Sequence, residues 1–346
     1  MKKFLNKLLS IVAAMAVCLS TIPVSITGTT VYAEEKTTNI LFVGNSMTST
    51  KESITRNLKQ IIADTGENAT NDTMICFGKG FKEFADRKGE YGKRLRKMLK
   101  KKKYDYIVFQ EQPSAMVTAF ETETYPCFKT LKKLAVKNGA KPIIFMTWRF
   151  NYVFKRTING KKYKYTPKQM LDIMAKNSLK LGAKYHTRVV TAGLYFEYSN
   201  KINKDIFLWR PKENKHQGYN RAYLVACVFY RELFQKSTSN INYYGKVSKK
   251  NALKLQKVAD MEMSINKKKL ELKPGKSAKL KAKISSLSQN KRYNAKKDNY
   301  TYESANTKVA TVNKYGRVKA VGKGRTLIYV TSKKTGFMKA CTVVDK

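Results

Sequence analysis

From Thr38 onward, largely apolar segments of strand length alternate with stretches of helical periodicity. The sequence predicts strands at Asn39–Val43, Thr73–Phe77, Tyr106–Phe109, Pro142–Thr147 and Thr187–Ala192. Helices are predicted at residues 53–65, 124–137, 167–181, 223–233 and 243–260, and a basic helix is predicted after Gly80 with residues 94–98 near its end. Strands that are apolar throughout are typical of a parallel sheet covered by helices on both faces. In such sheets functional side chains gather at the carboxyl ends of the strands.

The chain from Met261 onward has a different pattern, with short alternating segments separated by Gly and Asn turns. Strands are predicted at residues 279–284, 300–302, 309–313, 317–321, 325–331 and 339–344. Many short strands with turns between them are typical of an antiparallel β-sandwich. We therefore predict two domains, residues 34–260 and 261–346, which is a number that 346 residues can support.

The N-terminus has the pattern of an export signal. Lysines at positions 2, 3 and 7 precede the apolar run Leu8–Leu19, and Val31-Tyr32-Ala33 offers the small residues that a signal peptidase needs. The apolar run is too short to span a bilayer comfortably. We predict a signal peptide over residues 1–33 and a product that is secreted, extracellular or cell-wall associated, without stable membrane insertion.

The formal net charge of +46 limits the partners of the chain. A strong positive field attracts nucleic acid, anionic membranes or anionic cell-wall polymers. The lysines are spread over both domains and form no aromatic-laced stripe, which argues against a nucleic-acid groove. Anionic cell-wall polymers are the preferred partner among the three.

Four cysteines follow the predicted signal peptide: Cys76, Cys127, Cys227 and Cys341. Their spacing matches no zinc pattern, so we expect no metal and no cofactor. Disulfides are possible outside the cell, but the sequence does not require them.

Three predicted strand ends carry groups that suit catalysis. They are Gly44-Asn45-Ser46, Gly78-Lys79-Gly80 and Gln110-Glu111-Gln112. A serine on a strand-to-helix turn near helix N–H groups suits a nucleophile that passes through an oxyanion. A bare glycine N–H and a side-chain amide can both donate to that oxyanion. The alternatives are a helix-capping serine, an ordinary turn and a hydrogen-bonded loop.

The chain has only two histidines, His186 and His216. Glu213 precedes His216 by three residues, so one turn can hold both, and the carboxylate can orient the imidazole. His186 begins a predicted strand without a neighbouring acid, and we interpret it as structural.

These motifs, in this order, resemble those of the SGNH/GDSL hydrolases, and most closely the bacterial branch with Gly-Asn-Ser in its first block. The resemblance covers about residues 38–260. Gly44-Asn45-Ser46 matches the first block, Gly78 the second, Gln110-Glu111 the third, and Glu213 to His216 the fifth. It implies a flavodoxin-like three-layer α/β fold. It also implies a catalytic triad of Ser46, His216 and Glu213, and an oxyanion hole formed by Ser46, Gly78 and Gln110, with Gly80 and Gln112 as alternatives for the last two.

The sequence departs from that branch at three places. Glu213 stands where Asp is usual, Gln217 where Pro is frequent, and Gln110 or Gln112 replaces an asparagine. The resemblance implies an esterase that acts on acylated carbohydrate. Trp148 and Tyr219 could stack on a sugar, or could equally pack in the core or at the rim. The alternative function is a degenerate domain that binds glycan at the cell surface without turnover.

The C-terminal segment resembles the bacterial immunoglobulin-like group 2 module. The matching segments are Leu272–Ser277, Glu303–Asn306, Val309–Val312, Gly316–Ala320 and Val321–Gly324. The resemblance implies an all-β sandwich that serves as a non-catalytic spacer or an adhesive unit.

Overall fold

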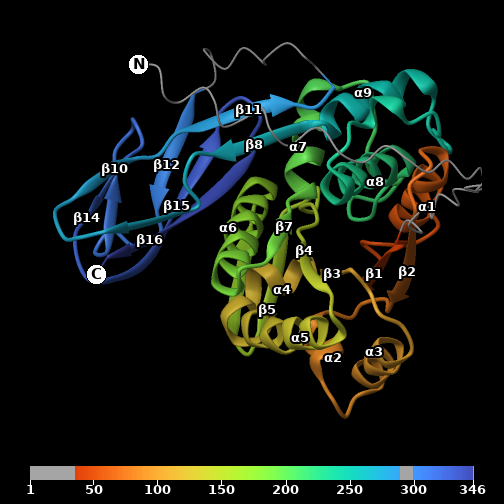
Figure 1. The fold of residues 1–346 in the computed structure, drawn as a ribbon, viewed down its shortest axis with the longest axis horizontal. Coiled ribbons are helices and arrows are strands. Elements are labelled where there is room, and N and C mark those ends of the chain that lie inside the picture. The colour runs from red at the N-terminus through yellow and green to blue at the C-terminus, as the bar shows by residue number, and fades with distance from the viewer. Residues whose placement is uncertain (1–35, 289–298, 346) are drawn as a thin grey trace, which may run out of the picture. The chain divides into compact units, whose positions relative to one another are not determined.

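The structure is a computed structural model that describes residues 36–288 and 299–345. The predicted signal peptide lies outside the described residues. The chain forms an α/β domain followed by a β-rich C-terminal region (Figure 1).

A five-stranded parallel sheet forms the centre of the α/β domain, in the order β2-β1-β3-β4-β7. Its strands are β1 (Thr38–Gly44), β2 (Ala69–Ile75), β3 (Tyr106–Gln110), β4 (Lys141–Phe145) and β7 (Arg188–Val190). This is the flavodoxin-like strand order, so the predicted fold is confirmed. The apolar residues of β1 and β3 are buried because helices cover both faces of the sheet.

Strand β2 begins and ends earlier than the sequence predicts. It pairs only with β1 and is mostly half-exposed. Its polar residues Thr70 to Thr73 are compatible with this exposure. An edge strand tolerates such residues because one side of it is open to solvent, and its apolar pattern is therefore weak.

Helices cover the sheet in two layers (Figure 1). One layer contains α1 (Ile54–Asp64), α7 (Ala192–Ile202), α8 (Tyr219–Phe234) and α9 (Lys249–Ala259). The other contains α2 (Phe81–Ala85), α3 (Glu90–Lys101), α4 (Pro113–Thr118), α5 (Tyr125–Asn138) and α6 (Pro167–Tyr185). The sequence does not predict α2, α4 or α7. It also misses the hairpin of β5 (Phe154–Ile158) and β6 (Lys161–Tyr165).

The C-terminal region consists of strands, as predicted. They are β8 (Met261–Ile265), β9 (Lys269–Leu272), β10 (Ser277–Lys279), β11 (Ala282–Ser286), β12 (Tyr300–Ser304), β13 (Ala310–Val312), β14 (Arg317–Ala320), β15 (Gly324–Ser332) and β16 (Met338–Asp345). Their pairings are antiparallel except that β9 pairs in parallel with β16. The sheet edge formed by β9 therefore differs from the purely antiparallel sandwich that the sequence predicts.

The four cysteines of the described residues are all free thiols. No group of acidic, histidine or cysteine side chains in the described part of the chain could hold a metal ion. Among the described helices, none has the length and apolar character needed to cross a membrane.

Candidate active site

Ser46 lies in a tight turn after β1. The carbonyl of Asn45 accepts the N–H of Thr48 at 2.9 Å, and the Asn45 side chain accepts the N–H of Met47 at 3.0 Å. Helix α1 begins only at Ile54, where the Ser53 side chain caps it. The predicted start of this helix near Ser53 is confirmed, and the alternative that Ser46 is the helix cap is wrong.

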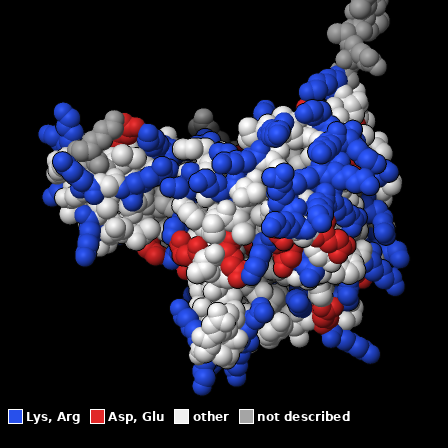
Figure 2. Space-filling view, turned by 90° about the horizontal axis from the view of Figure 1, so that it is seen from below, with Lys and Arg blue, Asp and Glu red and all other residues white. Residues whose placement is uncertain are grey.

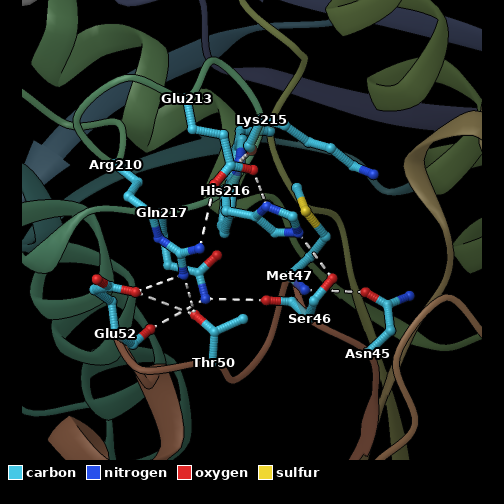
Figure 3. A network of polar contacts seen from close by, with 11 residues as sticks. Asn45, Ser46, Met47, Thr50, Glu52, Arg210, Glu213, Lys215, His216 and Gln217 are labelled. Carbon is cyan, nitrogen blue, oxygen red and sulfur yellow. Dashed lines mark hydrogen bonds and ion pairs between the residues drawn. The ribbon is translucent and has the colours of Figure 1, made fainter.

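The structure brings the three predicted triad residues together (Figure 3). The Nε2 atom of His216 lies 3.0 Å from Ser46 Oγ, and its Nδ1 atom hydrogen-bonds the carboxylate of Glu213. The His216 side chain is 19% exposed, so solvent and substrate can reach it. This is the order of contacts that moves a proton from a serine to a histidine and stabilises the resulting imidazolium.

A short loop before α8 holds the acid and the base. An isolated bridge between Trp209 and Gln217 closes the loop, and the N–H of Arg210 donates to the carbonyl of His216. The N–H of Glu213 in turn donates to the carbonyl of Arg210 at 3.1 Å. The three-residue spacing of the acid and the histidine thus places both on one turn, as the sequence predicts.

Arg210 extends the triad to a second carboxylate that the sequence analysis did not identify (Figure 3). Its Nη1 lies 3.2 Å from Glu213 Oε2, and its Nη2 lies 2.6 Å from Glu52 Oε2. The Glu52 side chain is only 7% exposed. Burial raises the pKa of Glu213, but the hydrogen bond and charge of His216 and the charge of Arg210 lower it overall. Arg210 therefore fixes one oxygen of Glu213 while His216 occupies the other.

Replacing Arg210 by glutamine is expected to move the acidic limb of the pH–kcat/KM profile to higher pH. The substitution removes a positive charge that lowers the pKa of the Glu213 carboxylate, so the carboxylate becomes protonated at a higher pH and then no longer orients His216. The test is to measure the rate of ester hydrolysis over a range of about five pH units, from about pH 4 to about pH 9. A loss of activity by the same factor at every pH would contradict an electrostatic role for Arg210. Lys212→Gln, in the same loop but without an ion pair among the described residues, is the control.

Gln217, at the position where the resembling branch often has proline, joins the two halves of the site. Its side chain is fully buried, and its Nε2 lies 3.1 Å from the carbonyls of both Ser46 and Glu52. The loop with the base and the turn with the nucleophile are therefore directly hydrogen-bonded, which preserves the distance between Ser46 and His216.

The turn that contains Gly78 offers one backbone N–H that has no acceptor among the described residues. Gly78 has a φ of +73°, which favours glycine, and in the described residues neither its N–H nor that of Ser46 has an acceptor. The N–H of Gly80 is already bonded to Glu83 Oε2 at 2.9 Å. Asn45 Nδ2 donates to Lys79 O at 2.7 Å and so ties this turn to that of Ser46. Of the two glycines, the contacts favour Gly78 as an oxyanion donor.

The Gln110 side chain does not have the predicted role of donating a hydrogen bond to the oxyanion. Gln110 is buried, and its Oε1 accepts from the Asn45 N–H at 2.9 Å and the Thr48 hydroxyl at 3.0 Å. Its Nε2 donates to the carbonyl of Glu111. In this arrangement the Gln110 amide supports the Ser46 turn. Gln112 precedes α4 and is half-buried, and its N–H donates to the carboxylate of Glu111.

Glu111 connects the second and third blocks. Its buried carboxylate accepts hydrogen bonds from the N–H groups of Phe81 and Gln112 and from the hydroxyl of Thr124. Burial raises the pKa of Glu111 to about 7, although these hydrogen bonds lower it. The carboxylate is therefore a structural link beneath the site.

Trp148 is fully buried, so it packs in the core and cannot stack on a sugar in this structure. Its Nε1 donates to the carbonyl of Lys215 at 3.0 Å and thereby supports the His216 loop. Beside it lies the buried guanidinium of Arg221, which stacks 4.6 Å from the Trp148 ring and 4.6 Å from that of Trp209. Among the described residues it has no hydrogen-bond partner. Burial lowers the pKa of Arg221.

Tyr219 and His186, the other two residues considered in the sequence, form no hydrogen bond with the triad among the described residues. Tyr219 begins α8 and is half-buried, with Lys246 Nζ 5.1 Å from its ring centre. His186 ends α6 in a left-handed conformation with a φ of +49°.

Comparison with known proteins gives different matches for the two domains. Residues 261–343 match the model of the family described as the bacterial Ig-like domain (group 2). This part of the chain is a bacterial Ig-like domain. A search of curated proteins found no match.

The α/β domain is similar in fold to one solved structure, and two further structures match parts of the chain with TM-scores below 0.5. A DUF4886 family protein from Bacteroides uniformis is 12% identical, with a TM-score of 0.54 and coverage of 65% of this chain and 93% of that one. A protein from Slackia heliotrinireducens, provisionally described as an SGNH hydrolase, is 19% identical, with a TM-score of 0.45 and coverage of 56% and 97%. An intimin mutant from EHEC O157:H7 is 23% identical, with a TM-score of 0.19 and coverage of 24% and 45%.

Proposed function

We propose that the protein is a secreted serine esterase that removes short acyl groups, such as acetyl, from the hydroxyls of a carbohydrate. The observation that carries this proposal is the line of contacts from Ser46 Oγ through His216 to Glu213. The N–H groups of Ser46 and Gly78, both without an acceptor in the described residues, complete the set of groups that acyl transfer requires.

In the acylation step, Ser46 Oγ attacks the ester carbonyl while His216 Nε2 takes its proton. The Glu213 carboxylate stabilises the imidazolium that forms. The negative charge on the former carbonyl oxygen is stabilised by the Ser46 and Gly78 N–H groups, each of which contributes about 3 kcal/mol in comparable enzymes. The intermediate then collapses, the acyl C–O bond to the sugar breaks, and His216 donates its proton to the departing sugar oxygen, which leaves as a hydroxyl.

In the second step a water molecule takes the place of the sugar. His216 removes a proton from the water as it attacks the acyl group on Ser46, and the same donors stabilise the second oxyanion. Collapse releases the carboxylic acid and returns the proton to Ser46 Oγ. No metal or cofactor takes part in this scheme.

The N-terminal sequence and the Ig-like domain support secretion. Intact-mass analysis of material from the culture medium is expected to give a chain that begins near Glu34, because Ala33 ends the predicted cleavage motif. A secreted chain that retains residues 1–33 would contradict the signal-peptide interpretation.

The function is tested by acid release from acetylated xylan, from O-acetylated peptidoglycan and from a chromogenic acetate. Wild type is expected to release acetate from at least one of them, and Ser46→Ala from none. If wild type binds these polymers but Ser46→Ala does not change any turnover, the protein is a glycan-binding module and the esterase proposal fails.

A further inference from the structure

The β5–β6 hairpin is a basic element inserted directly after β4. Asn159 and Gly160 form its turn with φ angles of +48° and +75°, the conformation of a two-residue type I′ turn. The strand register pairs Lys155 with Lys164 and Thr157 with Lys162. Alternation along the strands therefore places these three lysines on one face, and all three are exposed.

The charge of this hairpin is not compensated by ion pairs among the described residues. The sequence contains no Asp or Glu between Glu123 and Asp172. In the described part of the chain, none of the basic residues of the hairpin forms an ion pair. Like charges directly opposite each other on neighbouring strands are destabilising. A face with Lys155 opposite Lys164 is therefore expected to bind an anionic partner.

The base of the hairpin is attached to the loop that carries His216. The N–H of Asn151 donates to the carbonyl of Asn214 at 2.9 Å, and Trp148 Nε1 bonds the carbonyl of Lys215. Phe154, the first hairpin residue, is buried with its ring 6.0 Å from that of Phe150. A chain of three residues spans at most about 11 Å, so the hairpin begins close to the catalytic loop.

An exposed aromatic ring, that of Tyr152, precedes the hairpin by two residues. Tyr152 is 44% exposed and stacks on Phe150 with ring centres 5.2 Å apart. Partial burial raises the pKa of Tyr152, and the nearby charge of Glu213 raises it further. A tyrosine ring with one open face beside a catalytic acid is suited to stack on a sugar.

We propose that the β5–β6 hairpin is a docking arm for an anionic glycan that carries the ester, with Tyr152 stacking on the sugar nearest the triad. This inference rests on the proposed esterase function and specifies its substrate as a polymer with repeated phosphate or carboxylate groups. Residues two apart on a strand are about 7 Å apart, so the three lysines contact successive anionic groups better than one small anion. Figure 2 shows that Lys and Arg cover much of the face in view, with Asp and Glu in a narrower band.

Two features of the hairpin favour a glycan over single-stranded nucleic acid. Tyr163 and Tyr165 lie on the opposite face from the three lysines, together with Arg156 and Lys161. Nucleic-acid surfaces combine basic groups and stacking rings on the same face, whereas the face with the three lysines carries no ring of the hairpin. The aromatic ring available for stacking is Tyr152, which lies at the triad end of the hairpin and not along the row of lysines.

The test compares K155Q/K162Q/K164Q with K273Q/K276Q/K283Q, which removes three exposed lysines of the Ig-like domain and leaves the same net charge. Both are made in the secreted full-length chain. The substrates are a neutral chromogenic acetate, an acetylated polygalacturonate and an acetylated polyol phosphate. The hairpin variant is expected to lose about tenfold or more in kcat/KM on at least one anionic polymer at low salt and less than about twofold on the neutral ester. The control variant is expected to match wild type on all three.

Binding to the same polymers without acetyl groups is measured as a function of salt, which separates this inference from the proposed function. Wild type is expected to bind more weakly as salt rises, with a shallower dependence in the hairpin variant. If wild type hydrolyses no ester but binding still depends on the hairpin, the esterase proposal fails and the polyanion site stands. Equal polymer binding by wild type and the hairpin variant would overturn the docking arm. So would hairpin-dependent binding of single-stranded DNA that exceeds binding of both polymers.

Discussion

Replacing Ser46 by alanine is expected to lower kcat for ester hydrolysis by at least about 10³-fold, and replacing His216 by alanine should have a similar effect. The two side chains act as one unit, because Ser46 Oγ is a weak nucleophile until His216 removes its proton. The double variant should therefore be little worse than either single variant. Steady-state kinetics on a chromogenic acetate, with enzyme concentrations high enough to measure the residual rate, check this.

Glu213→Ala is expected to cost about ten- to a hundredfold less than the loss of Ser46, because an orienting acid is less essential than the nucleophile. His186→Ala is the matched control, since His186 ends α6 and has no contact with the triad in the described residues. It should leave kcat unchanged. If His186→Ala abolished activity while His216→Ala did not, the assignment of the base would be wrong.

Gly193→Ala is expected to lower the free energy of unfolding by about 3 kcal/mol. A Cβ at this position on α7 would lie 2.1 Å from the carbonyl oxygen of Thr147 and 3.0 Å from the Cα of Trp148. Both are backbone atoms at the end of β4, so the contact can be relieved only by shifting the segment that supports the His216 loop. Chemical denaturation measures the stability, and kcat/KM should fall with it.

Gly89→Ala provides the control for Gly193→Ala. Its Cβ would meet only the side chain of Asp86, at 2.6 Å, and a carboxylate at the end of a side chain can rotate away. The expected change is therefore within about 1 kcal/mol. Equal stability of the two variants would show that the close approach of α7 to β4 is not required.

The sequence was sufficient to predict the parallel sheet and, through the resemblance, the contact between Ser46 and the Glu213–His216 turn. The strands and turns depend on short-range patterns, whereas the pairing of Ser46 with His216, 170 positions apart, came from the order of the family motifs. Arg210 and Glu52 belong to none of those motifs and are 158 positions apart, so no local pattern or family motif pairs them. The buried state of Trp148 likewise depends on neighbours from distant segments, since both Phe196 and Arg221 pack near its ring.

The β5–β6 hairpin was missed although a local signal was present. Asn159-Gly160 lies between segments of alternating residues, which is a strong sequence signal for a two-residue hairpin. The dense basic residues concealed it, because one face of the hairpin holds three lysines, and Arg156 and Lys161 interrupt the apolar residues of the other face. The sequence therefore predicted only alternating strands and helices, and the hairpin that follows β4 was missed.

The buried stacking around Arg221 also gives the protein a built-in optical probe. The chain has two tryptophans, Trp148 and Trp209, and both indoles lie 4.6 Å from the same guanidinium. All of its tryptophan emission therefore originates beneath the His216 loop, and the Ig-like domain contributes none. A change in that emission on adding a ligand would report a movement of this one region, and a melting curve followed by it would record only the unfolding of the α/β domain.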